Sequence, residues 1–220
     1  MSLTSQVNTS HLRSILHWMQ SDPDRLRALL AEEAADAVPY PAGDAAIRAH
    51  LRFVAEALAA TTGGSQHAPL EAFAARLPAV MAEPRRLEAE LELMGEAAEH
   101  ELRLQFGAAA AQDPSLRVMA RRRVRIGAWH RVFLRALEDA LGSEAASAHK
   151  ALTWMANHQT VLADTIFAMD KHAKQLAVSR AGPDAVADVA VVNQIGHEAA
   201  LRAHTRFLAE ALVATLRLDD

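Results

Sequence analysis

Cysteine is absent from the 220 residues of this chain. Its absence excludes disulfide bonds, thiolate zinc sites, cysteine-ligated iron–sulfur clusters and cysteine nucleophiles. The 11 histidines and the carboxylates are then the side chains that remain for metal chemistry.

An excess of charge of one sign and long apolar runs are also lacking. The 23 Lys and Arg residues nearly balance the 27 Asp and Glu residues, for a formal charge of −4, which predicts no general attraction to nucleic acid or anionic lipid. No stretch approaches the roughly 20 apolar residues of a membrane span, and residues 1–10 do not resemble a signal peptide. We therefore expect a cytoplasmic protein that binds neither nucleic acid nor membrane.

Aromatic residues make up only 5% of the chain, whereas 51% is hydrophobic, much of it alanine. Apolar residues recur at helical spacing, and strand-like alternation is nearly absent. The sequence predicts an all-α fold of about eight helices, either globin-like or an antiparallel helical bundle. We expect a single domain over residues 1–220, in which shorter helices within 1–82 pack on a long-helix bundle formed by 84–218.

Proline and glycine positions set the expected helix boundaries. The shorter helices are predicted at 9–20, 23–37, 44–62 and 69–81, and the longer ones at 84–111, 114–141, 143–179 and 183–218. Segment 44–61 is echoed at 198–215, with most positions identical. No second pair of segments continues this match, which argues against a repeating solenoid.

Motifs of hydrolases and nucleotide-dependent enzymes are missing. The chain has no His-Glu-x-x-His, Walker, Gly-x-Gly-x-x-Gly or Gly-x-Ser-x-Gly sequence. No nucleophile or acid–base group stands out either, so we favour a non-catalytic role without excluding an enzyme. One metal alternative is geometric: the predicted long helices place His100, His130, His158 and His197 near their middles, where a bundle brings side chains to one level for zinc or iron.

The segment 121–133 carries the clearest indication of a ligand-binding site. On a helix, Ile126, His130 and Phe133 fall on one apolar stripe, and Gly127 lies one turn before His130. A neutral imidazole facing an apolar space, beside a position without a side chain, is what an axial haem ligand requires. Nearby arginines would pair with acidic groups of such a ligand.

The sequence Arg-Val-Arg-Ile-Gly-Ala-Trp-His over 123–130 resembles the proximal-histidine motif of the sensor globins, and a looser resemblance extends over about residues 44–180. It implies a globin-like sensor that binds haem with His130 as iron ligand, beside Gly127, Ile126 and Phe133. The family's early Phe-Tyr pair is missing near Phe53, so the pocket is equally open to another apolar ligand or to none. The segment 125–129 also resembles the chemoreceptor zinc-binding domains, but Val124 stands where that family has a cysteine ligand.

These observations leave three functions open. The first is a non-catalytic globin-like sensor that binds haem at His130 and passes its signal to a separate protein partner. The second is a histidine-rich bundle that binds a metal ion or a small apolar ligand, with His100, His158 and His197 as ligands. The third is a structural or interaction protein without cofactor. In each case we expect a homodimer, formed through apolar positions of the predicted helix 183–218.

Overall fold

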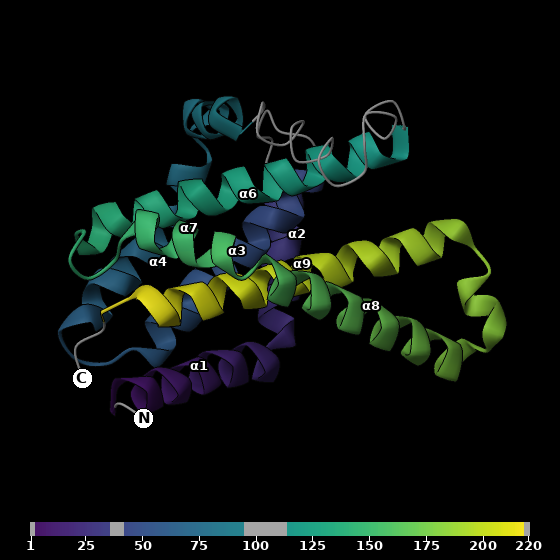
Figure 1. The fold of residues 1–220 in the computed structure, drawn as a ribbon, viewed down its shortest axis with the longest axis horizontal. Helices are drawn as coiled ribbons and strands as arrows, with labels where there is room; N and C mark the ends of the chain where they lie inside the picture. Colours follow the sequence, from purple (N-terminus) through teal and green to yellow (C-terminus); the bar gives the residue numbers. More distant parts are fainter. Residues whose placement is uncertain (1–2, 36–41, 95–113, 218–220) are drawn as a thin grey trace. The chain divides into compact units, whose positions relative to one another are not determined.

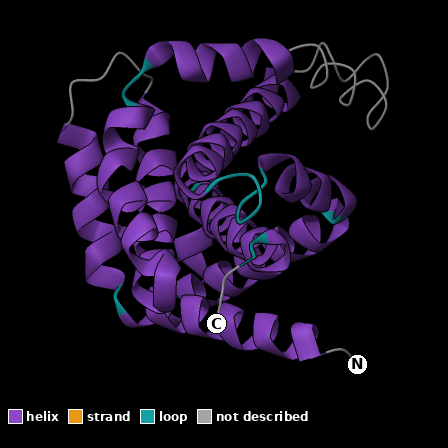
Figure 2. Ribbon diagram, turned by 90° about the vertical axis from the view of Figure 1, so that its left-hand side faces the viewer, coloured by secondary structure: helices purple, strands orange, loops and turns teal. Residues whose placement is uncertain are grey.

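A computed structural model describes the chain except for residues 1–2, 36–41, 95–113 and 218–220 (Figure 1). The described residues form helices joined by short loops, and no strand occurs among them (Figure 2). The predicted all-α class is therefore confirmed. None of the described helices is both long enough and apolar enough to cross a membrane.

Contacts divide the chain into two compact units. Unit 1 comprises Met1–Pro23 and His149–Leu216, and unit 2 comprises Asp24–Ala148 and Arg217–Asp220. The boundary between the units thus differs from the expected division at residues 82–84. The expectation of a single domain stays a prediction.

Unit 1 is built on a helical hairpin. Its helices are α1 (Leu3–Ser21), α7 (Ala148–Asn157), α8 (Gln159–Ala181), the short 3-10 helix η3 (Pro183–Val186) and α9 (Val189–Thr215). Helices α8 and α9 run antiparallel and are joined through η3, and α9 also packs against α1 (Figure 1). Asp188 caps α9 by accepting a hydrogen bond from the Ala190 amide at 2.7 Å, which satisfies one free donor of the first turn.

Unit 2 contains α2 (Pro23–Ala35), α3 (Ala42–Thr61), η1 (Gly64–Gln66), α4 (His67–Met81), a helix over 84–94 and α6 (Pro114–Leu141). Helix α3 packs on α4, and both pack on α6. The rings of Phe73 in α4 and Phe133 in α6 meet edge to face with centroids 5.2 Å apart. Both side chains are buried, so this contact lies in the core of the unit.

Several predicted boundaries hold, and two long helices are corrected. Helices α2, α3, α4 and α6 begin and end within about two residues of expectation. The predicted helix 143–179 is wrong, because the chain breaks at His158 into α7 and α8. The predicted helix 183–218 is also divided, since η3 precedes α9. Residues 95–111 of the predicted helix 84–111 lie outside the described residues.

The repeated segments are helices with the same burial pattern. Phe53 in α3 and Phe207 in α9 are each 2% exposed, and neighbouring apolar positions are buried in both. The likeness extends to the order of the helices. Helix α1 precedes the pair α2 and α3, and α7 precedes the pair α8 and α9. Trp18 in α1 and Trp154 in α7 each lie three residues before the end of their helix. The second segment is longer: α8 has 23 residues against 13 in α2, and α9 has 27 against 20 in α3.

Candidate functional site

The predicted haem-site residues lie together on the buried face of α6. Ile126 is 2% exposed, His130 4% and Phe133 0%. Their spacing of four and three residues places them on one face, as the sequence predicts. In the folded protein this face is part of the core of unit 2.

Gly127 of α6 lies against the side chain of Met94, in the helix over 84–94. A Cβ atom built at Gly127 would lie 2.6 Å from Cε of Met94 and 3.4 Å from its sulfur. Cβ atoms do not tolerate such a distance, so the methionine side chain fills the space that the glycine leaves. Close helix packing is therefore sufficient to explain this glycine.

Met94 fills the position beside Gly127 that a haem on His130 would use. A haem on His130 needs open space beside the imidazole, and Met94 occupies the side-chain-free position one turn away. Haem binding at His130 thus stays a prediction that requires Met94 to move.

Three arginines of α6 pair with carboxylates of unit 2. Arg125 donates to both oxygens of Asp44 at the start of α3, including a 2.8 Å bond from Nε, and Asp44 is only 2% exposed. Arg131 lies 4.0 Å from Glu90, which also pairs with Arg135. These ion pairs join α6 to neighbouring helices, so Arg125 pairs with a carboxylate of the protein itself.

The alternative metal residues are placed differently from expectation. His158 lies at the junction of α7 and α8, where its ring stacks on Trp154 with centroids 4.1 Å apart and its Nδ1 contacts the Trp154 carbonyl at 2.7 Å. His197 lies in α9, and His100 lies outside the described residues. Among the described residues, no three His, Asp or Glu side chains gather where they would hold a metal ion. The proposed set with His100 therefore stays a prediction.

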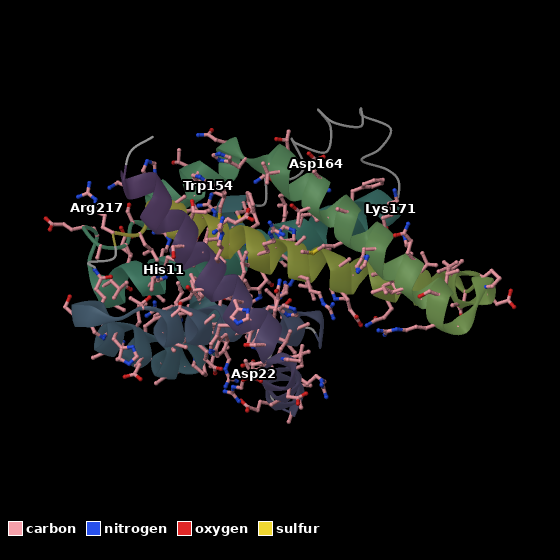
Figure 3. The ribbon with its side chains drawn as sticks, turned by 90° about the horizontal axis from the view of Figure 1, so that it is seen from below. His11, Asp22, Trp154, Asp164, Lys171 and Arg217 are labelled. Atoms are coloured by element: carbon pink, nitrogen blue, oxygen red, sulfur yellow. The ribbon has the colours of Figure 1, made fainter. Side chains whose placement is uncertain are left out.

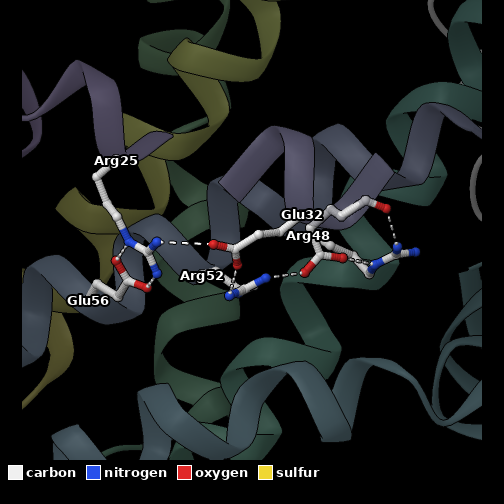
Figure 4. A network of polar contacts seen from close by, with 6 residues as sticks. Arg25, Glu32, Arg48, Arg52 and Glu56 are labelled. Atoms are coloured by element: carbon white, nitrogen blue, oxygen red, sulfur yellow. Dashed lines mark hydrogen bonds and ion pairs between the residues drawn. The ribbon is translucent and has the colours of Figure 1, made fainter. Parts of the chain in front are cut away.

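A network of six charged side chains ties α2 to α3 (Figure 4): Arg25, Glu32, Glu33, Arg48, Arg52 and Glu56. Its inner pair is buried, with Arg48 donating to Glu33 at 2.6 Å and side-chain exposures of 4% and 3%. The hydrogen bond from Arg52 lowers the pKa of Glu32. Three positive and three negative charges balance, so the network leaves no net charge for a ligand and has a structural role.

The most unusual surface is the end of the α8–η3–α9 hairpin. We call residues 163–198 the hairpin arm. No residue of the hairpin arm is buried, whereas α9 beyond it carries ten buried residues, from Ala199 to Val213. Large apolar side chains are nevertheless common in the arm: Ile166, Phe167, Met169, Leu176, Val178, Val186, Val189, Val191, Val192 and Ile195. The arm therefore presents apolar surface that unit 1 does not cover.

Two of these apolar side chains are largely exposed to solvent. Phe167 in α8 is 70% exposed and Val189 at the start of α9 is 72% exposed. Inside the hairpin, Gly196 of α9 faces Asp170 of α8, since a Cβ at Gly196 would lie 3.4 Å from Asp170 Oδ1. The sequence predicts apolar contact positions on the C-terminal helix but not on α8, because it predicts one continuous helix over 143–179.

Comparison with known proteins adds no relative. No protein-family model, curated protein or solved structure matches this chain.

Proposed function

We propose that this chain is a non-catalytic interaction protein that works as a homodimer, with the hairpin arm as its contact surface. The observation that carries the proposal is the absence of any buried residue over 163–198, although this segment contains five Val, two Ile, one Leu, one Met and one Phe. Four of its large apolar side chains are exposed: Phe167, Leu176, Val189 and Val191. Exposed apolar side chains gathered on one segment are typical of interaction sites.

A second hairpin is a fitting occupant for this surface. Two antiparallel helices bury apolar residues only along their shared seam, whereas two hairpins together complete a four-helix bundle with a closed core. Most soluble homo-oligomers are two-fold dimers in which the same patch of each subunit meets its copy.

Sedimentation equilibrium of the purified protein tests this proposal. The wild type should sediment as a dimer at micromolar concentration. The double variant Phe167→Ser/Val189→Ser should shift toward monomer, because it removes the two most exposed apolar side chains of the arm. Leu93→Ser is the matched control, since Leu93 is 66% exposed but lies in unit 2, and it should stay dimeric. A monomeric wild type would refute the proposal.

A second candidate is haem binding at His130, the sensor-globin function that the resemblance implies. The position of Gly127 one turn before a buried His130 favours it, and among the described residues the atoms within 4 Å of a Cβ at Gly127 belong to the flexible side chain of Met94. Met94→Ala would open that space.

Titration with haemin tests the second candidate. Binding at this site predicts a Soret band near 400 nm that is stronger for Met94→Ala, is lost in His130→Ala and is kept in His158→Ala. If Met94→Ala takes up no haemin, or if His130→Ala still binds it, this candidate fails.

A further inference from the structure

We propose that two copies of α8 pack antiparallel in the dimer, with the two-fold axis passing between them at the level of Phe167 and Ala168. In this register, Asp164 of each subunit pairs with Lys171 of the other. This inference rests on the proposed homodimer and specifies its register. It names the side chains that let one copy of the chain recognise a second copy.

One stripe of α8 faces solvent along most of the helix. Its members are all exposed and recur mainly at spacings of three and four residues: Thr160, Asp164, Phe167, Ala168, Lys171 and Gln175. Such residues lie on one helical face. Phe167, the most exposed large apolar side chain of α8, stands at the middle of this stripe.

The charges of the stripe are complementary to themselves. Asp164 lies three residues before Phe167, and Lys171 lies three residues after Ala168. If two copies of α8 pack antiparallel about an axis between Phe167 and Ala168, each Asp164 meets a Lys171 of the other copy. Neither side chain forms an ion pair with a described residue of its own chain, and both project from α8 in Figure 3.

The same register pairs a large side chain with a small one. Phe167 of one subunit faces Ala168 of the other, so the ring is accommodated without a clash, and this happens twice across the axis. Interdigitation of large and small side chains is the usual way for helices to pack closely.

The hairpin of α8 and α9 is longer than the matching pair of α2 and α3. Helix α8 has 23 residues and α9 has 27, whereas α2 and α3 have 13 and 20. The hairpin arm, without a buried residue, contains the part of α8 beyond the length of α2. These extra turns, residues 172–181 of α8, contain no buried residue, and the pairing of Asp164 with Lys171 lies in the turns just before them.

Other classes of partner fit the arm less well. The arm carries charges of both signs, because Lys171, Lys174 and Arg180 lie between two acidic residues before them, Asp164 and Asp170, and two after them, Asp184 and Asp188. Lys174 is already paired with Asp170 at 2.6 Å. A surface that carries both positive and negative charges does not attract nucleic acid or an anionic membrane. It suits an antiparallel second copy, whose positive charges lie opposite the negative charges of the first.

Charge reversal tests the register. Asp164→Lys alone and Lys171→Asp alone should each raise the dimer dissociation constant about tenfold or more, because each places like charges opposite one another at both ends of the contact. An equimolar mixture of these two variants should form a heterodimer, since every Lys then meets an Asp. The double variant Asp164→Lys/Lys171→Asp should dimerise like the wild type.

Cross-linking locates the axis. The chain has no cysteine, so any disulfide formed by a single introduced cysteine joins two molecules. Ala168→Cys should give a cross-linked dimer on mild oxidation, because the two residues at the axis lie within disulfide reach. The exposed Ser179→Cys is the control: in this register the two copies lie roughly 35 Å apart along the helices and should not cross-link.

The outcomes separate the register from the proposed homodimer. A dimer that is insensitive to both charge reversals, or that cross-links through Ser179→Cys and not through Ala168→Cys, overturns the register and leaves the homodimer standing. A wild type that stays monomeric at about 100 µM overturns both.

Discussion

The methyl group of Met94 occupies the space beside Gly127, so that a Cβ atom at Gly127 would lie 2.6 Å from Met94 Cε. We expect Gly127→Val to destabilise the protein by about 1–3 kcal/mol, because its branched side chain would force Met94 away from α6. Thermal unfolding followed by circular dichroism measures the change.

Gly43→Val is the matched control for this variant. Gly43 also lies in a helix, but no heavy atom comes within 4 Å of a Cβ built there, so we expect little change in stability. Equal losses in the two variants would show that steric contact with Met94 is not the cause.

The buried pair of Arg48 and Glu33 gives a second prediction. Arg48→Met should destabilise the protein by about 3–5 kcal/mol, because it leaves the Glu33 carboxylate buried without its main partner. Urea unfolding should then show that Arg48→Met/Glu33→Leu recovers much of the loss, since no buried charge remains. The exposed pair of Arg27 and Asp24 is the comparison, and Arg27→Ala should cost less than about 1 kcal/mol.

The helices themselves could be predicted from the sequence because proline and capping residues act locally. Pro23 and Pro114 begin helices where the sequence predicts them. The break at His158 could not be predicted, since no proline or glycine marks it. Its ring stacks on Trp154, and that contact depends on the folded helix end.

The candidate site could be predicted only in part. The stripe of Ile126, His130 and Phe133 follows from helical periodicity, and the structure buries all three. What fills the space beside Gly127 depends on Met94, which lies 33 positions earlier in the chain, and periodicity carries no information about such contacts. The sequence also gives no sign that the apolar residues of the hairpin arm lack cover, because burial is a property of the packed structure.

The pH dependence of stability should involve His11 in α1. Burial lowers the pKa of His11 below its ordinary value of 6.5, and its Nε2 atom is buried without a hydrogen-bond partner among the described residues. As the pH falls below about 6.5, the unfolded chain takes up a proton that the folded state resists, so the free energy of unfolding falls. Urea unfolding at pH 7.5 and pH 5.5 measures this loss.

Substitution of histidines isolates this contribution. His11→Gln should reduce the loss of stability between pH 7.5 and pH 5.5, because glutamine does not titrate. The exposed His17→Gln in the same helix is the control and should leave the loss as in the wild type. An undiminished loss in His11→Gln would assign the pH dependence to other groups.

Dimerisation through the hairpin arm should couple stability to protein concentration. If folding and association are linked, mass action stabilises the folded dimer, and Tm of the wild type rises as the concentration increases from about 1 to 100 µM. Phe167→Ser should lose most of this dependence while keeping the Tm that the wild type has at low concentration, because Phe167 is 70% exposed and contributes little to the core of unit 1. Differential scanning calorimetry at several concentrations distinguishes these cases. Alternatively, Phe167→Ser lowers Tm by the same amount at every concentration. That result would mean that the ring stabilises the hairpin itself and that the arm has no special role in association.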